Sequence, residues 1–396
     1  MKKILSWLLI LVLLIISLAS CSQNLSEGSS NNKSGNKTLN VNEYVCETPT
    51  RILYSLDDTL YYYNKLDGGS YVFCFNPVCK HKNDCISKKL RFGIWQGITY
   101  REEDNRLYAL RGNNFLSMNF DGSDIKFLYS FGENNWNDNQ YETIVLQYLQ
   151  LVGEYAYMLV QNEDTANMEL HRYHIDEGIL ENLMMNTSQI VSIERYTTNG
   201  EEIYFWSYSA EQHGFYKSNM DLTNVQKLSE GDDGYYSPDS VFDGETFYIP
   251  VYEKINDKTF TKEFRTYNVK EQRETLLCKL DVEGYAYIYS ITDHYLYYSV
   301  NNPIIIGQKK TGLGNVYDQK NYHSSVQRLD METGEIQTVF YNLNYEILGM
   351  CLIDNSVMLR GHIFEKSGDY IISDSYMMIA NIDENGNFVN IRVLEE

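Results

Sequence analysis

The chain has 396 residues, of which 33 are Lys or Arg and 54 are Asp or Glu, so its formal charge is −21. This acidic balance excludes a nucleic-acid-binding protein, because contact with phosphates needs a basic surface. Hydrophobic residues make up 43% of the chain, and Tyr alone occurs 35 times against 5 Pro. Such a composition excludes extensive disorder and favours β-strands, since aromatic side chains suit a half-buried pleated surface.

The first segment has the features of a secretory signal. Two lysines precede an apolar run over residues 4–18, which is short for a transmembrane helix. The tetrapeptide at residues 18–21 (LASC) follows directly, and small residues before a cysteine at this place resemble the lipobox of bacterial lipoproteins. The resemblance implies that diacylglyceryl is transferred to the Cys21 thiol and that the chain is cleaved before Cys21. An ordinary signal peptide with a nearby cysteine is the alternative.

These features divide the chain into three parts. We expect residues 1–20 to be a lipoprotein signal peptide and residues 21–42 to be the lipidated Cys21 with a flexible tether, since this stretch is rich in Ser, Asn, Gly and Lys. Two acyl chains anchor a protein stably. The expected location is therefore the extracellular face of the cell membrane, with residues 43–396 as the folded domain.

A turn that begins at Asp or Asn and passes through Gly or Asn recurs along the folded domain. Asp and Asn favour such turns because their side chains bond the local backbone, and Gly tolerates a positive φ. Seven copies lie 45–60 residues apart, the fifth of them degraded, with anchors at Asp67, Asp121, Asp176, Asp221, Lys270, Asp330 and Asp383.

A second pattern, a polar turn leading into an aromatic strand, precedes most of these turns. It begins, for example, at Asn105, Gly153 and Asn199. Seven units of about 50 residues, each with several short strands, are typical of β-propeller blades. The sequence thus predicts an all-β fold, a β-propeller of seven four-stranded blades, with six or eight blades as alternatives because one unit is degraded and the first is compact.

In the predicted blade, strands A to D run from the inside to the outside of the ring, and the recurring turn joins C to D. The A–B and C–D turns then share one face of the ring, and the B–C and D–A connections share the other. Three B–C connections are long, at residues 253–262, 301–324 and 362–373. Long insertions on one face of a repeat fold indicate a binding surface. Tolerated surface insertions are the alternative, because loop length costs little free energy.

A group of cysteines lies early in the folded domain. The segment at residues 74–79 (CFNPVC) is followed by His81 and Cys85, and Cys46 precedes it. This segment resembles a Cys-x-x-Pro-x-Cys-x-His-type element in surface lipoproteins of Gram-positive, clostridial-type anaerobes, which carry it early in a propeller-like region. The resemblance implies the architecture and the location, and no activity.

Three interpretations of this group stay open. Two disulfides among Cys46, Cys74, Cys79 and Cys85 are the first, since exported chains are often cross-linked. A structural zinc site is the second, because Cys79 and His81 share one face of an extended segment, and Cys74 and Cys85 complete four ligands. A reactive thiol beside His81 is the third.

Two further cysteines, Cys278 and Cys351, lie in apolar strands, and we expect them to be core thiols. No catalytic signature occurs, so the sequence predicts no catalytic residue and no certain cofactor. We expect a binding or scaffolding module that engages a protein, peptide or glycan through the long-loop face. The alternatives are an extracellular enzyme acting on glycans or peptides with carboxylates in the funnel, and an accessory or sensor subunit of a membrane transporter or signalling complex.

Overall fold

A computed structural model describes residues 45–394 with several gaps, all within one compact unit that spans residues 36–396. The gaps are 57–58, 77, 81–84, 86–94, 132–145, 208–213, 230–239, 256–257, 281, 283–284, 293, 303–304, 309–314, 318–322, 344, 354–355 and 368–369. The predicted signal peptide (residues 1–20), the tether with Cys21 (residues 21–42) and His81 lie outside the described residues.

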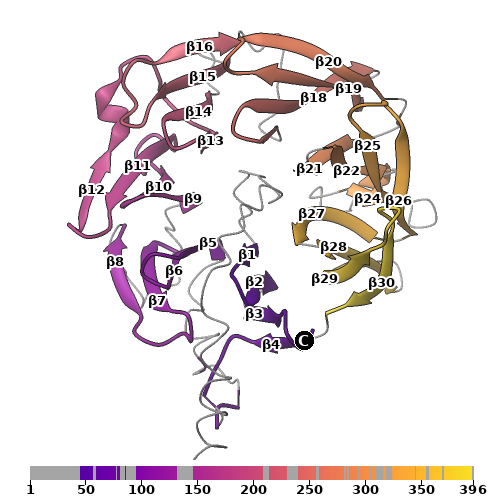
Figure 1. Ribbon diagram of the computed structural model, residues 1–396, viewed down its shortest axis with the longest axis horizontal. Helices are drawn as coiled ribbons and strands as arrows, with labels where there is room; N and C mark the ends of the chain where they lie inside the picture. The colour runs from indigo at the N-terminus through magenta and orange to yellow at the C-terminus, as the bar shows by residue number, and fades with distance from the viewer. Residues whose placement is uncertain are drawn as a thin grey trace, which may run out of the picture. The chain divides into compact units, whose positions relative to one another are not determined.

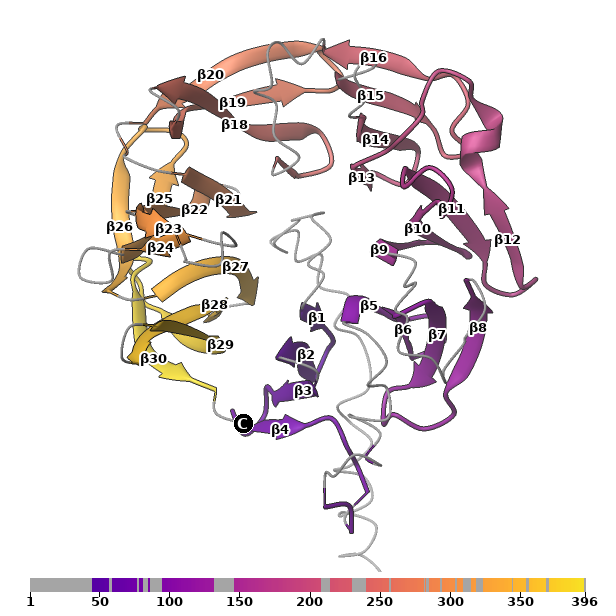
Figure 2. The same cartoon turned by 180° about the vertical axis from the view of Figure 1, so that it is seen from behind.

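Seven four-stranded antiparallel sheets are arranged as the blades of a ring (Figure 1; Figure 2 shows it from behind). Blade 1 consists of β1 (Val45–Glu47), β2 (Arg51–Leu56), β3 (Thr59–Asn64) and β4 (Ser70–Val72), and blade 2 of β5 (Trp95–Arg101), β6 (Arg106–Arg111), β7 (Asn114–Asn119) and β8 (Lys126–Ser130). Blade 3 consists of β9 (Leu146–Val152), β10 (Tyr155–Gln161), β11 (Met168–His174) and β12 (Ile179–Asn182), and blade 4 of β13 (Arg195–Thr198), β14 (Glu202–Ser207), β15 (Gly214–Asn219) and β16 (Gln226–Ser229).

Blades 5 to 7 complete the ring. Blade 5 consists of β17 (Val241–Phe242), β18 (Thr246–Ile255), β19 (Lys258–Asn268) and β20 (Arg273–Lys279). Blade 6 consists of β21 (Tyr285–Ile291), β22 (Tyr295–Asn302), β25 (His323–Asp330) and β26 (Ile336–Leu343), and blade 7 of β27 (Tyr345–Ile353), β28 (Ser356–Ser367), β29 (Tyr370–Ile382) and β30 (Phe388–Val393). The prediction of seven four-stranded blades is confirmed. The described residues contain one short 3-10 helix, η1 (Leu183–Asn186), and no helix among them is long and apolar enough to cross a membrane.

The recurring Asp or Asn turns lie where the sequence predicts them, between the third and fourth strands of each blade. In the last blade, Asp383 Oδ1 accepts hydrogen bonds from the backbone N–H of Asn385 (2.9 Å) and Asn387 (2.8 Å). Gly386 follows with φ of 77°, and a Cβ there would lie 1.5 Å from a guanidinium nitrogen of Arg328. Glycine is therefore favoured at this turn by its backbone conformation, whereas the flexible Arg328 side chain can move aside for a Cβ.

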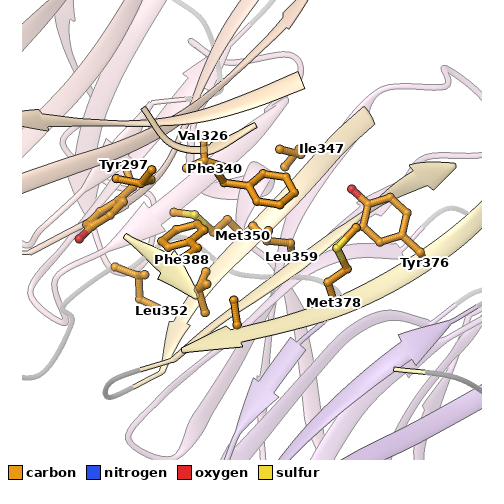
Figure 3. Close-up of a cluster of buried hydrophobic side chains, with 13 residues drawn as sticks. Tyr297, Val326, Phe340, Ile347, Met350, Leu352, Leu359, Tyr376, Met378 and Phe388 are labelled. Carbon is orange, nitrogen blue, oxygen red and sulfur yellow. The ribbon is translucent and has the colours of Figure 1, made fainter. Parts of the chain in front are cut away.

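Apolar clusters fill the spaces between neighbouring blades. Figure 3 shows the cluster between blades 6 and 7, in which Tyr297 and Phe340 pack against Met350, Leu359 and Phe388. Alternate residues of a strand point to opposite faces of the sheet, so each blade contributes one set of side chains to each of its two neighbours. The blades thus hold one another in place around the ring.

The first and last blades close the ring by the same kind of packing. Ile52 and Tyr54 of blade 1 share a buried cluster with Met358, Met377 and Ile379 of blade 7. Blade 1 takes all four of its strands from residues 45–72, so no strand of the last blade is inserted into the first. Closure therefore depends on side-chain packing and not on strand exchange.

The three long B–C connections are extended β-hairpins and not loops. β18 and β19 pair out to Ile255 and Lys258, and β28 and β29 pair out to Ser367 and Tyr370. The B–C connection of blade 6 contains a separate two-stranded hairpin, β23 (Ile305–Gln308) with β24 (Asn315–Tyr317). The predicted long connections therefore contain paired strands, and strand pairing continues past the blade in blades 5 and 7.

Candidate functional site

Three of the four predicted cysteines come together in the connection between β4 and β5. The Sγ atoms of Cys74, Cys79 and Cys85 all lie within 4.8 Å of one another. Cys85 is buried, with 1% of its surface exposed, and Cys74 and Cys79 are half-buried. This D–A connection lies on the same face of the ring as the B–C hairpins.

The local backbone explains how Cys79 returns to Cys74. The backbone N–H of Cys74 donates to the carbonyl of Val72 (2.7 Å), directly after β4. Asn76 then forms a turn: its carbonyl accepts from the N–H of Cys79 (3.0 Å), and its side-chain Oδ1 accepts from the N–H of Val78 (3.1 Å). An asparagine that bonds its own backbone favours such a turn.

Aromatic packing holds the start of this connection against blade 1. Phe73 is fully buried, and its ring meets that of Phe75 edge-on with centroids 5.4 Å apart. Phe75 stacks on Tyr62 at 5.3 Å, and the Arg51 guanidinium lies 4.6 Å from the centroid of the Phe75 ring. Cys74 therefore lies between two anchored aromatic residues.

The chemistry of the cluster follows from its burial. Burial raises the pKa of the Cys74 thiol to about 11, against a hydrogen bond from the Asn76 backbone, and the thiols of Cys85 and Cys79 raise it further. The cysteines that the structure describes form no disulfide. The group can act as a soft, thiol-rich ligand set, because a divalent cation displaces the thiol protons on binding.

Cys46 does not join this cluster. It is 5% exposed and packs with Leu53 and Leu60 in the core between blades 1 and 2. Burial raises the pKa of its thiol to about 12. One of the four cysteines thus lies in the core, and the other three form a group of their own.

The two remaining cysteines lie on strands, as predicted. Cys278 of β20 is half-buried, and burial raises the pKa of its thiol to about 11. Cys351 of β27 is half-buried and packs against the apolar cluster that closes the ring.

The face that carries the B–C hairpins is asymmetric. Blades 1 and 2 turn tightly from β2 to β3 and from β6 to β7, where Gly112 has a φ of 51°. Blades 5, 6 and 7 carry the three extended hairpins. In the sequence, residues 253–262 and 303–322, of which 256–257, 303–304, 309–314 and 318–322 lie outside the described residues, contain six Lys against three Asp or Glu, and residues 362–373 of the blade 7 connection contain one Lys against two. In a chain with a formal charge of −21, the first two segments are a locally basic region.

A histidine–carboxylate pair lies at the base of the blade 7 hairpin. His362 Nδ1 of β28 is 3.3 Å from Glu346 Oε2 of β27, and their side chains are 34% and 27% exposed. The Tyr376 hydroxyl donates to the Glu346 carbonyl (3.1 Å), which fixes the start of β27. Sequence reasoning missed this pair, because its two members are distant in the sequence and meet only through strand pairing.

A polar cavity of about 620 Å³ lies between blades 3 and 4, where the connection after β12 passes the C–D turn of blade 4. Five of its twelve lining residues carry amide side chains, and the lining includes the Glu202–Lys217 ion pair, with 2.9 Å between oxygen and nitrogen. Asn186 Nδ2 donates to the carbonyl of Asp221 (2.7 Å) and links the two blades. No sequence motif marks this cavity, whose residues come from two blades.

No family model matches the chain, and no curated protein matches it in sequence. Solved structures with a similar fold include an oligogalacturonate lyase from Vibrio parahaemolyticus, with 10% identity, a TM-score of 0.50, and 85% of this chain and 87% of that one covered. An oligogalacturonate lyase in complex with manganese has 8% identity and a TM-score of 0.53 over 85% of this chain and 86% of that one. A puromycin hydrolase has 10% identity and a TM-score of 0.54, and the match covers 91% of this chain but only 54% of the hydrolase. At such identities the likeness shows the fold alone: the chain is a seven-bladed β-propeller of the kind found in these enzymes.

Proposed function

We propose that the chain is a lipid-anchored extracellular binding module that holds an acidic glycan on the hairpin face of blades 5, 6 and 7. The observation that carries this proposal is the asymmetry of that face, where three consecutive blades carry paired hairpins and blades 1 and 2 have tight turns. A rigid β-hairpin presents its side chains with less loss of conformational entropy than a flexible loop of equal length.

The charge of the hairpins supports an acidic ligand. Of the lysines in the blade 5 hairpin, Lys262 is half-exposed and lies 3.4 Å from Glu253 across the pair of strands. Lysines grouped within a net-negative surface attract anions locally and leave the rest of the molecule repulsive to them. Two of the structures with a similar fold are named as oligogalacturonate lyases. Oligogalacturonate is an acidic oligosaccharide, which supports the choice of an acidic glycan as the ligand.

The proposed anchor places this binding face outside the cell. It rests on the resemblance of residues 18–21 to a lipobox. In cells given a labelled fatty acid, we expect the label on the full chain and none on the Cys21→Ser variant.

Binding is tested on the full chain carrying Cys21→Ser, with immobilised polygalacturonate as the acidic probe and dextran as the neutral one. The triple variant Lys254→Gln, Lys258→Gln, Lys262→Gln removes three charges from the blade 5 hairpin. We expect it to weaken polygalacturonate binding by about tenfold or more, and we expect added salt to weaken the binding of the parent chain.

The matched control is the triple variant Lys65→Gln, Lys126→Gln, Lys270→Gln, which removes three charges from the opposite face. These three lysines lie in or beside C–D turns. This variant should bind as the parent chain does. Equal losses in both triple variants would show that net charge and not the hairpin face governs binding. Binding of polyglutamate but not of polygalacturonate would replace the glycan by an acidic peptide.

A second candidate is an enzyme acting on the same ligand, and the His362–Glu346 pair favours it. A histidine beside a carboxylate at a partly exposed position can accept and return a proton. If the chain is an enzyme, His362→Ala should abolish the appearance of new chain ends in polygalacturonate and leave binding intact. His294→Ala is the matched control, since His294 Nδ1 is 3.4 Å from Glu332 Oε1 on the opposite face, which carries the A–B and C–D turns.

A further inference from the structure

The thiol cluster of Cys74, Cys79 and Cys85 has an odd number of members. A disulfide joins two sulfurs at about 2.0 Å and leaves the third unpaired. Cys46, the only other cysteine of this region, is buried among Leu53 and Leu60 in the core. A pairing that uses all the thiols of the group is therefore not available, whereas one metal ion can bind all three.

We propose that these three cysteines hold one Zn²⁺ as thiolates. Each thiol loses its proton to solvent as its sulfur binds the ion, so three protons leave and the Zn(Cys)₃ unit carries a net charge of −1. No electrons are transferred, and no oxidant or reductant is needed. The fourth position of a tetrahedral site is left for water or another neutral donor.

The distances in the cluster suit this ion. In a tetrahedral site with Zn–S bonds of about 2.3 Å, neighbouring sulfurs lie about 3.8 Å apart. The three Sγ atoms already lie within 4.8 Å of one another, so they need to approach by about 1 Å at most. The turn at Asn76 and the packing of Phe73 and Phe75 hold Cys74 and Cys79 in this arrangement before any ion binds.

The proposed ion has a structural role in the D–A connection. Residues 73–94 link β4 to β5, and 77, 81–84 and 86–94 among them lie outside the described residues. An ion bound by Cys74, directly after β4, and by Cys85 would cross-link two points of this connection. Zinc sites of this kind contribute their binding free energy to folding, so removing the ion should lower stability.

The test uses the full chain carrying Cys21→Ser, purified with reductant. Its zinc content is measured by inductively coupled plasma mass spectrometry. Chelator-treated protein is then titrated with Zn²⁺ and with Co²⁺ alone. We expect one equivalent of zinc, a near-ultraviolet charge-transfer band on Co²⁺ binding that is diagnostic of thiolate ligands, and protection by Zn²⁺ of three thiols against alkylation. Chelation should lower the unfolding temperature.

Each of Cys74→Ala, Cys79→Ala and Cys85→Ala should weaken Zn²⁺ binding by about 100-fold or more. Cys278→Ala is the matched control, since Cys278 is also half-buried with a thiol pKa raised to about 11, and it should bind Zn²⁺ as the parent chain does. Cys79 is half-buried, so its variant is decisive if the Cys85 variant fails to fold. The alkylation assay needs no variant at all.

Two results would overturn the proposal. One is a reduced, folded chain that binds neither Zn²⁺ nor Co²⁺ and leaves all three thiols open to alkylation. The other is a loss of zinc in Cys278→Ala as large as in the three cluster variants.

Discussion

Arg392, in the last strand, donates a hydrogen bond from its guanidinium group to the carbonyl of Gly68, in the C–D turn of the first blade. The same guanidinium lies 5.7 Å from the centroid of the Tyr63 ring. These contacts lie at the surface, and the buried cluster around Met377 and Tyr54 lies between the same two blades. The ring is thus closed at its seam by the polar contacts of Arg392 with Gly68 and Tyr63 outside and by apolar packing inside.

This closure predicts that the two kinds of contact differ in strength. Met377→Ala, at a side chain that is fully buried, should lower the free energy of unfolding by about 2–5 kcal/mol, because it leaves a cavity in the seam. Arg392→Ala should cost less than about 1 kcal/mol, since exposed polar contacts exchange with water. Urea unfolding measures both changes.

Met118→Ala is the matched control for the seam, because Met118 is fully buried in the cluster between blades 1 and 2. Losses of similar size would show that the seam is as well packed as the interface between two consecutive blades. A Met377→Ala chain as stable as the parent would mean that the first and last blades are not joined in this way.

The C–D turns predict a loss of stability in acid. Hydrogen bonds from the backbone N–H groups hold the pKa of Asp330 and Asp383 below the ordinary value of 3.8. A lowered pKa means that the folded state favours the carboxylate, so this contribution is fully present above pH 3.8 and is lost as the pH falls through the lowered values. Asp330→Asn and Asp383→Asn keep an oxygen acceptor without the charge, so together they should reduce the fall in stability between pH 5 and pH 2.

The control for the acid experiment is Asp164→Asn, which also replaces a carboxylate by an amide. It lies in a turn where Asn162 Oδ1 accepts the hydrogen bond from the backbone N–H of Asp164. Thermal unfolding across this pH range should give the same slope for the control and the parent chain. An unchanged slope in the double variant would show that the turn carboxylates do not govern acid stability.

His171 predicts a second pH dependence near neutrality. Its ring lies 6.0 Å from that of Phe131, between blades 2 and 3, and its Nε2 is 3.5 Å from Glu169 Oε2. Burial lowers the pKa of His171 below the ordinary value of 6.5, against the opposing effect of Glu169. The folded state thus favours the neutral ring, and stability should fall as the pH drops from 6.5 towards the lowered value.

His171→Gln should flatten the stability profile between pH 7 and pH 5, as measured by urea unfolding. His294→Ala, at a histidine whose side chain is 64% exposed, is the control and should leave the profile unchanged. A nuclear magnetic resonance titration that gave His171 a pKa above 6.5 would contradict the assignment.

The sequence pattern also predicts that His81 is the fourth ligand of the thiol cluster. His81→Ala should then weaken Zn²⁺ binding less than Cys79→Ala does, because three thiolates remain. Its Co²⁺ form should keep the thiolate charge-transfer band and change its visible bands, which report the donor set. His174→Ala is the control, and identical Co²⁺ spectra for the parent chain and His81→Ala would exclude His81 as a ligand.

The sequence predicted the blades well because their turns are local. Asp383 and Gly386 form a turn from four neighbouring residues, so a pattern of residue types is enough to locate it. The degraded copy at Lys270 also lies between the third and fourth strands of its blade, where Asn268 Oδ1 accepts a hydrogen bond from the N–H of Lys270 (3.0 Å) in place of an aspartate. The spacing of such turns then predicted seven blades, with six or eight as alternatives, and the structure has seven.

The candidate site could be predicted only in part, because its contacts join distant segments. The convergence of Cys74, Cys79 and Cys85 follows from their nearness in the sequence. Cys46 is buried in the core between blades 1 and 2, away from the thiol cluster. Its burial depends on which face of β1 meets blade 2, and the sequence does not show this directly. The His362–Glu346 pair and the extended hairpins depend on how far strand pairing continues, and local patterns do not encode that length.

Hydrogen–deuterium exchange of the full chain carrying Cys21→Ser, with and without polygalacturonate, tests the binding surface most directly. We predict that the glycan slows exchange in the hairpins β18–β19, β23–β24 and β28–β29 and leaves the C–D turns unchanged. Protection confined to the polar cavity around Asn186 and Lys217, with unchanged hairpins, would contradict the account and place the ligand between blades 3 and 4.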